Sequence, residues 1–255
     1  MSATDLTYGS YLRLDDLLDA QTTQTDAHDE LLFVIIHQTY ELWFKQILHE
    51  AALLQSRLEG GECAGALAPA RRIGKILKTV VGQLDILETM TPGGFTSFRS
   101  ELGSSSGFQS YQFRYIEAVV GRRDFSAGAR DDSLSAIVSR RSVFDSFLQC
   151  LALQGWPIPA DVLSRDVTQE WEGDERVQRV LIDLYRREGS VEAGLAEALV
   201  DIDEGLQEWR YRHVKMVERI IGAKIGTGGS AGAAYLRSTL FRPAFPDLWE
   251  IRSEL

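Results

Sequence analysis

The stretch from residue 28 to residue 46 constrains the fold most, because it predicts a helix that is apolar on nearly every face. It nevertheless carries His37 in its middle, and Phe33 lies four residues earlier on the same helical face. A buried imidazole needs a partner for its polar atoms. His37 is therefore either a core histidine bonded to a backbone carbonyl, the commoner case for one such segment, or part of a site for a flat, largely apolar ligand.

Composition and charge exclude several classes of protein. The chain has 255 residues and a formal net charge of −10, which disfavours nucleic acid, since Lys and Arg neutralise its phosphates. No run of about 18 apolar residues predicts a membrane span, and no N-terminal stretch resembles a signal peptide. Cys63 and Cys150 lie far apart and outside any CxxC motif. We therefore expect a cytoplasmic protein with no disulfide framework and with neither a membrane nor a nucleic acid as partner.

Helical periodicity dominates the chain, and no clear strand pattern is present. A short amphipathic helix is expected within an N-terminal arm, residues 1–20. Prolines and glycines then divide the chain into helices predicted at residues 27–58, 66–89, 95–102, 108–120, 134–153, 170–188, 191–222 and 235–240. No repeat and no long linker separates these segments. Residues 1–255 are therefore expected to form a single all-α domain, a bundle of long helices.

Two of the four histidines, His37 and His213, are candidates for an interior site. His28 and His49 fall on other helical faces and are expected at the surface. His213 shares a face of the last long helix with Trp209. A neutral imidazole on a core-facing helix is a good ligand for haem iron, although a satisfied core histidine is the commoner case for either residue alone. No CxxCH motif is present, so any haem would be held non-covalently.

Two further segments could contact a ligand. Arg99 lies beside the hydroxyl-rich residues 104–106, a combination that suits a carboxylate, although a lone arginine near a helix end is usually solvated. Residues 226–232 are rich in glycine and fit the loose pattern G-x-G-x-x-A. A helix rather than a strand precedes them, so we reject a dinucleotide site. A mobile loop that covers a ligand is favoured over a passive linker.

Six motifs occur along nearly the whole chain, from residue 6 to about residue 255. They are YGSYL at 8–12, HDELLFVIIHQTYELWFK at 28–45, LETMTP at 87–92, SSGFQS at 105–110, WRYRH at 209–213 and GTGGS at 226–230. In this order they resemble the tryptophan 2,3-dioxygenase family, haem enzymes that open the indole ring. The resemblance implies a haem pocket in the bundle, non-covalent haem b active as Fe(II), dioxygen as co-substrate, and a homotetramer.

The resemblance implies roles for residues at the haem. His213 falls on the proximal iron ligand, and Trp209 and Gly228 are placed at the cofactor with it. His37 falls on the distal histidine, which contacts the indole N–H. Ser106 falls on a hydroxyl near the distal haem face.

The resemblance also implies contacts to the substrate. Phe33 falls on the aromatic wall of its pocket, Arg99 on the arginine that binds its carboxylate, and Thr227 on the threonine that meets its ammonium group. Phe95 lies in the same pocket, where some relatives carry a tyrosine. Three residues of the arm fall on positions that reach into a neighbouring subunit's pocket: Tyr8, Tyr11 and Leu12.

The function implied is insertion of both atoms of dioxygen across C2–C3 of the indole ring of L-tryptophan, giving N-formylkynurenine in tryptophan catabolism by the kynurenine pathway. Two positions depart from the family pattern: Phe95, where some relatives carry a tyrosine, and Ala231, where a serine is usual in the glycine-rich loop. These departures leave a rival function open. That rival is a haem monooxygenase of the same fold, oxidising tryptophan or a β-substituted tryptophan to a hydroxylated indole or 2-oxindole in secondary metabolism. A haem sensor or carrier without turnover is a more distant alternative, and a scaffold protein without cofactor is the plainest.

Overall fold

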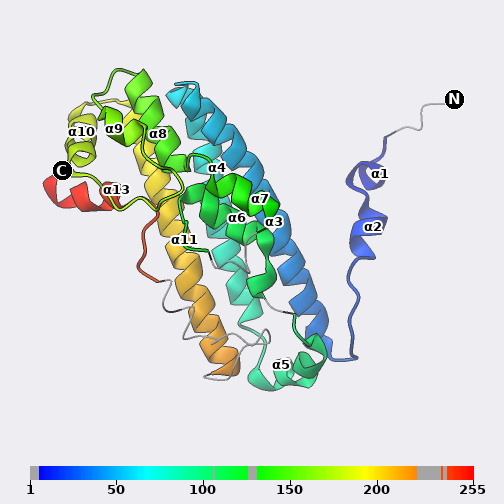
Figure 1. The fold of residues 1–255 in the computed structure, drawn as a ribbon. Helices are drawn as coiled ribbons and strands as arrows, with labels where there is room; N and C mark the ends of the chain where they lie inside the picture. The colour runs from blue at the N-terminus through cyan, green and yellow to red at the C-terminus, as the bar shows by residue number, and fades with distance from the viewer. Residues whose placement is uncertain (1–5, 106, 126–130, 223–236, 238–239) are drawn as a thin grey trace.

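The computed structural model describes residues 6–105, 107–125, 131–222, 237 and 240–255, and the regular elements in these ranges are all helical. Three long helices lie side by side at its centre (Figure 1). They are α3 (His28–Glu59), α4 (Cys63–Leu87) and α11 (Val191–Ile221). The predicted all-α, single-domain bundle is confirmed.

The directions of the long helices follow from their connections and contacts. α3 and α4 form an antiparallel hairpin that turns at Gly61, which adopts a φ of 73°. α4 and α11 run parallel, because Gly74 lies against Asp201 and Leu77 lies against Gly205 further along both helices. α3 and α11 are therefore antiparallel, and the middle of α3 lies level with the second half of α11.

Shorter helices close the sides and ends of this centre (Figure 1). Most predicted helices are confirmed with shifted ends, while α9 and α13 were not predicted. The predicted helix at 235–240 lies almost wholly outside the described residues. The shorter helices are α5 (Pro92–Arg99), α6 (Tyr111–Val120), α7 (Asp132–Val138), α8 (Val143–Leu153), α9 (Ala160–Leu163), α10 (Glu175–Arg186) and α13 (Pro246–Glu250), with 3₁₀ turns η1 (Ser100–Leu102), η2 (Gly107–Gln109) and η4 (Ile251–Glu254).

The single helix predicted over residues 134–153 is wrong, since the structure divides it into α7 and α8. The Asp131 side chain caps the start of α7 by accepting from the Leu134 amide at 2.7 Å. Ser142 begins α8 with a capping box, in which it and Asp145 each accept from the other's backbone amide. The capping box at Ser142 is therefore a helix start inside the apolar pattern, and it divides the helix although the helical period continues.

The expectation of no disulfide is also wrong. Cys63 and Cys150 are bonded to each other, with Cα atoms 6.6 Å apart, although 87 positions separate them in the chain. The α3–α4 turn brings the first residue of α4 beside α8. There the side-chain amide of Gln154 also donates to the Gly61 carbonyl at 2.7 Å. The spacing of two cysteines in sequence carries no information about such a tertiary contact.

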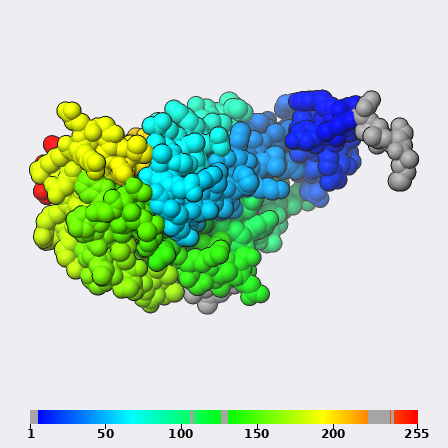
Figure 2. Space-filling view, turned by 90° about the horizontal axis from the view of Figure 1, so that it is seen from above, coloured from blue at the N-terminus to red at the C-terminus, as the bar shows by residue number. Residues whose placement is uncertain are grey.

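The N-terminal arm stands apart from the body of the molecule (Figures 1 and 2). It holds two short helices, α1 (Tyr8–Leu12) and α2 (Leu14–Leu18), rather than one, because Arg13 adopts a left-handed φ of 51° between them. Most of its large apolar side chains are exposed; Tyr8 keeps 76% of its surface accessible. No helix within the described ranges is long and apolar enough to cross a membrane.

Candidate functional site

His37 of α3 and His213 of α11 lie near each other across the bundle, since contacting aromatic rings join these two helices. Two rings, those of Tyr40 and Trp209, connect them. The His37 ring lies 6.1 Å from that of Tyr40, Tyr40 lies 5.8 Å from Trp209, and Trp209 lies 4.6 Å from His213, measured between ring centroids. The sequence around each histidine alone did not decide its role. The structure shows that both histidines belong to one site.

The surroundings of both histidines favour the neutral imidazole. Burial and, to a smaller extent, the nearby charge of His37 lower the pKa of His213 to about 4. Burial also lowers the pKa of His37, against the opposing effect of its hydrogen bond to Phe33. Both residues keep part of their surface open, while neighbouring side chains displace most of the water around the rings. At neutral pH each ring therefore offers an unprotonated nitrogen to a ligand.

The tautomer of His37 follows from its hydrogen bond. Its Nδ1 lies 2.7 Å from the Phe33 carbonyl oxygen, and a carbonyl can only accept, so Nδ1 carries the proton. The other nitrogen, Nε2, is then an acceptor. The interpretation of His37 as a core histidine bonded to a carbonyl thus describes one edge of the ring and leaves the second edge for a ligand.

Aromatic rings from α3 and α5 wall one side of the site. The Phe33 ring centroid lies 4.1 Å from that of His37, 5.8 Å from Phe95 and 5.6 Å from Phe98. Phe95 and Phe98 are buried and meet edge to face at 5.4 Å. Thr91 holds α5 in place for this contact, since its side chain accepts from the Gly94 amide at 3.0 Å. The wall is flat and apolar and suits an aromatic ligand.

Arg99 brings a positive charge to the same end of the bundle. It is half-buried at the end of α5, and its guanidinium carbon lies 5.9 Å from the centroid of the Phe95 ring. Arg99, Phe95, Phe33 and His37 thus follow one another in space. The structure brings together these predicted residues from two segments that are more than 50 positions apart in the sequence.

Two polar atoms beside the histidines indicate that the site takes a further group. The Tyr40 hydroxyl and the Trp209 Nε1–H are buried, and neither has a hydrogen-bond partner within the described part of the chain. Burying a donor without an acceptor costs about 1–3 kcal/mol. Neutral His213, two such donors and the apolar wall fit haem, since the imidazole would bind its iron, the wall would contact its ring and the donors would bind its carboxylates. Among the described residues, no group of three or more His, Cys, Asp or Glu side chains could hold a metal ion directly.

Of the remaining predicted residues, some lie outside the described part of the chain and three lie on the arm. Ser106, Thr227, Gly228 and Ala231 lie outside the described residues. The three arm residues lie on the exposed α1, apart from the helices that carry the site (Figure 1): Tyr8, Tyr11 and Leu12. The described part of the site is therefore formed by α3, α5 and α11.

Sequence reasoning did not single out Tyr40 and Phe98. Tyr40 lies three positions after His37 and seven after Phe33, a spacing that keeps all three on one helical face. That spacing was the available signal for Tyr40. Phe98 carried no comparable signal, since its part in the wall depends on how α5 packs against α3.

Comparison with known proteins agrees with the arrangement. The family model described as tryptophan 2,3-dioxygenase matches residues 1–130 and 179–255. The chain is 55% identical to a tryptophan 2,3-dioxygenase of Anaeromyxobacter sp. (strain K), over 98% of this chain and 96% of that protein. It is 52% identical to one of Herpetosiphon aurantiacus, over 98% of each chain. It is 44% identical to one of Caulobacter vibrioides, over 99% of this chain and 100% of that protein.

Proposed function

The chain belongs to the tryptophan 2,3-dioxygenase family, and on this basis we propose that it is a haem-dependent enzyme that inserts both atoms of dioxygen across C2–C3 of the indole ring of L-tryptophan. The product is N-formylkynurenine, an intermediate of tryptophan catabolism. The observation that carries the proposal is the pairing of neutral His37 and His213 across the bundle, beside an aromatic wall and a half-buried arginine.

His213 is the residue that would bind the haem iron, because its pKa of about 4 keeps the ring neutral. The unpartnered Trp209 Nε1–H is a donor for a haem carboxylate, and Gly228 of the glycine-rich loop is placed nearby by family resemblance. Haem b, held without covalent bonds and active as Fe(II), supplies a redox-active iron for dioxygen. The protein's own residues bind and orient the substrate.

His37 fixes the indole ring. Since its Nδ1–H donates to the Phe33 carbonyl, its Nε2 accepts the hydrogen bond from the indole N–H. Phe33 and Phe95 cover the apolar faces of the ring and exclude water from it. An indole held by one edge and one face has little freedom, and positioning of this kind can lower a barrier by several kcal/mol.

The amino-acid part of the substrate is bound by charge. The Arg99 guanidinium presents a planar fork to the carboxylate, and Thr227 accepts from the ammonium group. By family resemblance, Ser106 would contribute a hydroxyl to the same pocket. Together with His37 these contacts select an aromatic L-amino acid over a free indole.

We also propose an assembly and a location for the protein, both on the basis of its family membership. The exposed arm of one chain packs on a neighbouring subunit, where Tyr8, Tyr11 and Leu12 complete the pocket, and four chains form a homotetramer. A cytoplasmic location remains a prediction, and the disulfide between Cys63 and Cys150 removes one of the two arguments made for it.

Reconstitution with haem tests the proposed site. The full chain titrated with haem should acquire a Soret band and oxidise L-tryptophan, while His213→Ala should lose most of its haem affinity and its turnover. His49→Ala is the matched control, because His49 is exposed on α3. Normal haem loading in His213→Ala, or no haem uptake by the parent chain, would overturn the proposal.

A further inference from the structure

A buried carboxylate lies beside the helix that carries His213. Glu117 of α6 keeps only 7% of its side-chain surface accessible, and its Oε1 accepts from the Arg210 guanidinium of α11 at 3.0 Å. Arg122 donates to both oxygens of the same carboxylate at 3.0 Å. The side chain of Arg210 is itself only 14% exposed. Glu117 and Arg210 thus form an ion pair inside the fold, between α6 and α11.

This ion pair lies within one helical turn of His213. Arg210 comes three positions before His213 on α11, which corresponds to roughly 4.5 Å along the helix axis. On α6, Phe113 lies one turn before Glu117, and its ring centroid is 5.6 Å from that of Trp209. The Trp209 ring in turn lies 4.6 Å from that of His213. α6 therefore contacts α11 beside the histidine twice, through an aromatic pair and through the ion pair.

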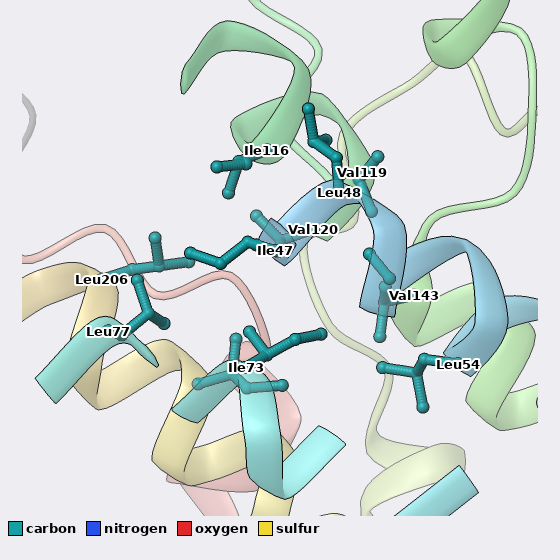
Figure 3. A pocket seen from close by; sticks show the side chains of 12 residues that line it. Ile47, Leu48, Leu54, Ile73, Leu77, Ile116, Val119, Val120, Val143 and Leu206 are labelled. Carbon is teal, nitrogen blue, oxygen red and sulfur yellow. The ribbon is translucent and has the colours of Figure 1, made fainter. Parts of the chain in front are cut away.

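The interior next to the ion pair is aliphatic. Ile116, which is adjacent to Glu117, lines a gap of about 10 Å³ inside the bundle (Figure 3). Leu206, one turn before Arg210, lines the same gap together with Ile47 of α3. The gap is at the lower limit of size for one water molecule, and its aliphatic walls offer no hydrogen bond to hold one. Charges beside such a region are screened far less than charges in water.

A charge at this place affects the oxidation state of an iron bound at His213. Reduction of haem iron from Fe(III) to Fe(II) adds one electron and lowers the charge of the site by one. A nearby carboxylate therefore favours Fe(III), and a nearby guanidinium favours Fe(II). The proposed reaction requires Fe(II). Arg210 thus favours the active oxidation state, while Glu117 opposes it and holds Arg210 in place.

A second ion pair next to His213 differs from the first in its exposure. Arg212, the residue before His213, donates to Asp85 of α4 at 2.6 Å. The side chain of Asp85 is 69% exposed, so water and salt screen its charge. Asp85 and Glu117 each pair with an arginine close to His213 on α11, but only the Glu117 carboxylate is buried.

We propose that the buried Glu117–Arg210 ion pair sets the reduction potential of the iron bound at His213. This role rests on the proposed function, since it requires haem at His213. The two members of the pair carry opposite charges at nearly the same place. Removing the charge of Glu117 should therefore raise the potential, and removing the charge of Arg210 should lower it.

Spectroelectrochemical titration of the full-length, haem-loaded chain tests these two signs. At the midpoint potential of the parent protein, Glu117→Gln should raise the ratio of Fe(II) to Fe(III) severalfold, and Arg210→Gln should lower it severalfold. A tenfold change in this ratio corresponds to about 59 mV for one electron. Glu117→Asp keeps the charge and should remain close to the parent. Disturbed packing alone would not move the two neutral variants in opposite directions.

Asp85→Asn is the matched control, because it removes an exposed carboxylate that pairs with Arg212. It should change the ratio of Fe(II) to Fe(III) less than Glu117→Gln does, and an equal change would contradict the role of burial. Circular dichroism shows whether each variant is folded. If Glu117→Gln does not fold, Arg210→Gln decides the question, since an unchanged or increased ratio in that variant would overturn the proposal.

Two failures are distinguishable. If the parent chain binds no haem, the proposed function fails, and the role of the ion pair fails with it. The other failure requires a parent chain that binds haem and oxidises tryptophan. If Glu117→Gln and Arg210→Gln then keep the parent's potential, or shift it in the same direction, the ion pair does not set the potential and the proposed function stands.

Discussion

At the scale of single residues, the site depends on what surrounds each polar group. His37 owes its free acceptor nitrogen to the Phe33 carbonyl, which fixes the proton on the other nitrogen. His213 owes its neutrality to burial. Neither property can be derived from the residue type, since the first depends on a contact within α3 and the second on how α11 is buried in the bundle.

Replacement of Arg99 tests the binding of the substrate carboxylate. Loss of a hydrogen-bonded charge costs about 1.5–3 kcal/mol, so Arg99→Ala should raise KM for L-tryptophan by roughly tenfold to a hundredfold. Arg99→Lys should recover part of the loss, since it keeps the charge without the planar fork. Arg71→Ala, at an exposed position of α4, is the control. An unchanged KM in Arg99→Ala would place the carboxylate elsewhere.

Glu30 gives the fold a predictable dependence on pH. Its carboxylate accepts from the Thr25 hydroxyl at 2.5 Å and from the Gln24 and Thr25 amides at 2.8 Å each. The Thr25 hydroxyl, more than the amides, lowers the pKa of Glu30 below its ordinary value of 4.5. The carboxylate therefore stabilises the fold above about pH 4.5, and this contribution is lost as pH falls through the lowered pKa.

The variant Glu30→Gln isolates this contribution. Its thermal midpoint should lie below that of the parent at pH 7, and the difference should shrink as the pH is lowered from 5 to 3. Asp26→Asn, at an exposed position four residues earlier, should match the parent throughout. A difference that stays constant down to pH 3 would show that the carboxylate charge is not responsible.

The sequence was informative at this scale where one helix carries the pattern. Phe33 and His37 could be paired from their spacing of four, and the structure confirms the contact at 4.1 Å. The proximity of Arg99 to His37 depends on the packing of α5 against α3. It could therefore be predicted only from family resemblance. The functional roles of these residues stay predictions until the variants are measured.

At the scale of helices, the long elements were predictable and their divisions were less so. The apolar periods of α3, α4 and α11 extend over roughly seven to nine turns, which outweighs any local ambiguity. α7 and α8 were predicted as one helix because their apolar pattern continues through the break, where the capping box at Ser142 begins a new helix. The Cys63–Cys150 bond depends on tertiary contact alone.

The close approach of α4 to α11 makes a testable difference between two glycines. A Cβ at Gly205 would lie 2.9 Å from the Leu77 Cβ, whereas a Cβ at Gly82 would meet nothing within 4 Å. Gly205→Ala should therefore cost about 1–3 kcal/mol by overpacking, while Gly82→Ala should gain about 0.5–1 kcal/mol in an exposed helix interior. Urea unfolding of both variants checks this. Equal stabilities would contradict the packing described.

At the scale of the whole molecule, the arm is the feature that a single chain does not explain. Leu6, Tyr8, Tyr11 and Leu18 each expose 70% or more of their surface, on an arm that extends at one end of the molecule (Figure 2). Apolar side chains gathered on such an extension indicate a partner surface. The sequence alone marked the arm as amphipathic, and family resemblance supplied the neighbouring subunit.

The mass in solution tests the role of the arm. Light scattering should give four chains of 28.5 kDa for the parent protein. The double variant Tyr8→Ser/Tyr11→Ser should dissociate into smaller species and lose substrate affinity together, because the same residues serve both functions. Asp15→Asn, also exposed on the arm, should remain tetrameric. A parent protein that is monomeric at micromolar concentration would contradict the proposed assembly.

The fate of dioxygen tests the central claim most directly. The haem-loaded chain is supplied with L-tryptophan and ¹⁸O₂ under reducing conditions, and the mass of the product is measured by mass spectrometry. The account predicts N-formylkynurenine that carries two ¹⁸O atoms. A product with one ¹⁸O atom, such as a hydroxylated indole or 2-oxindole, would contradict it and identify the chain as a monooxygenase of the same fold.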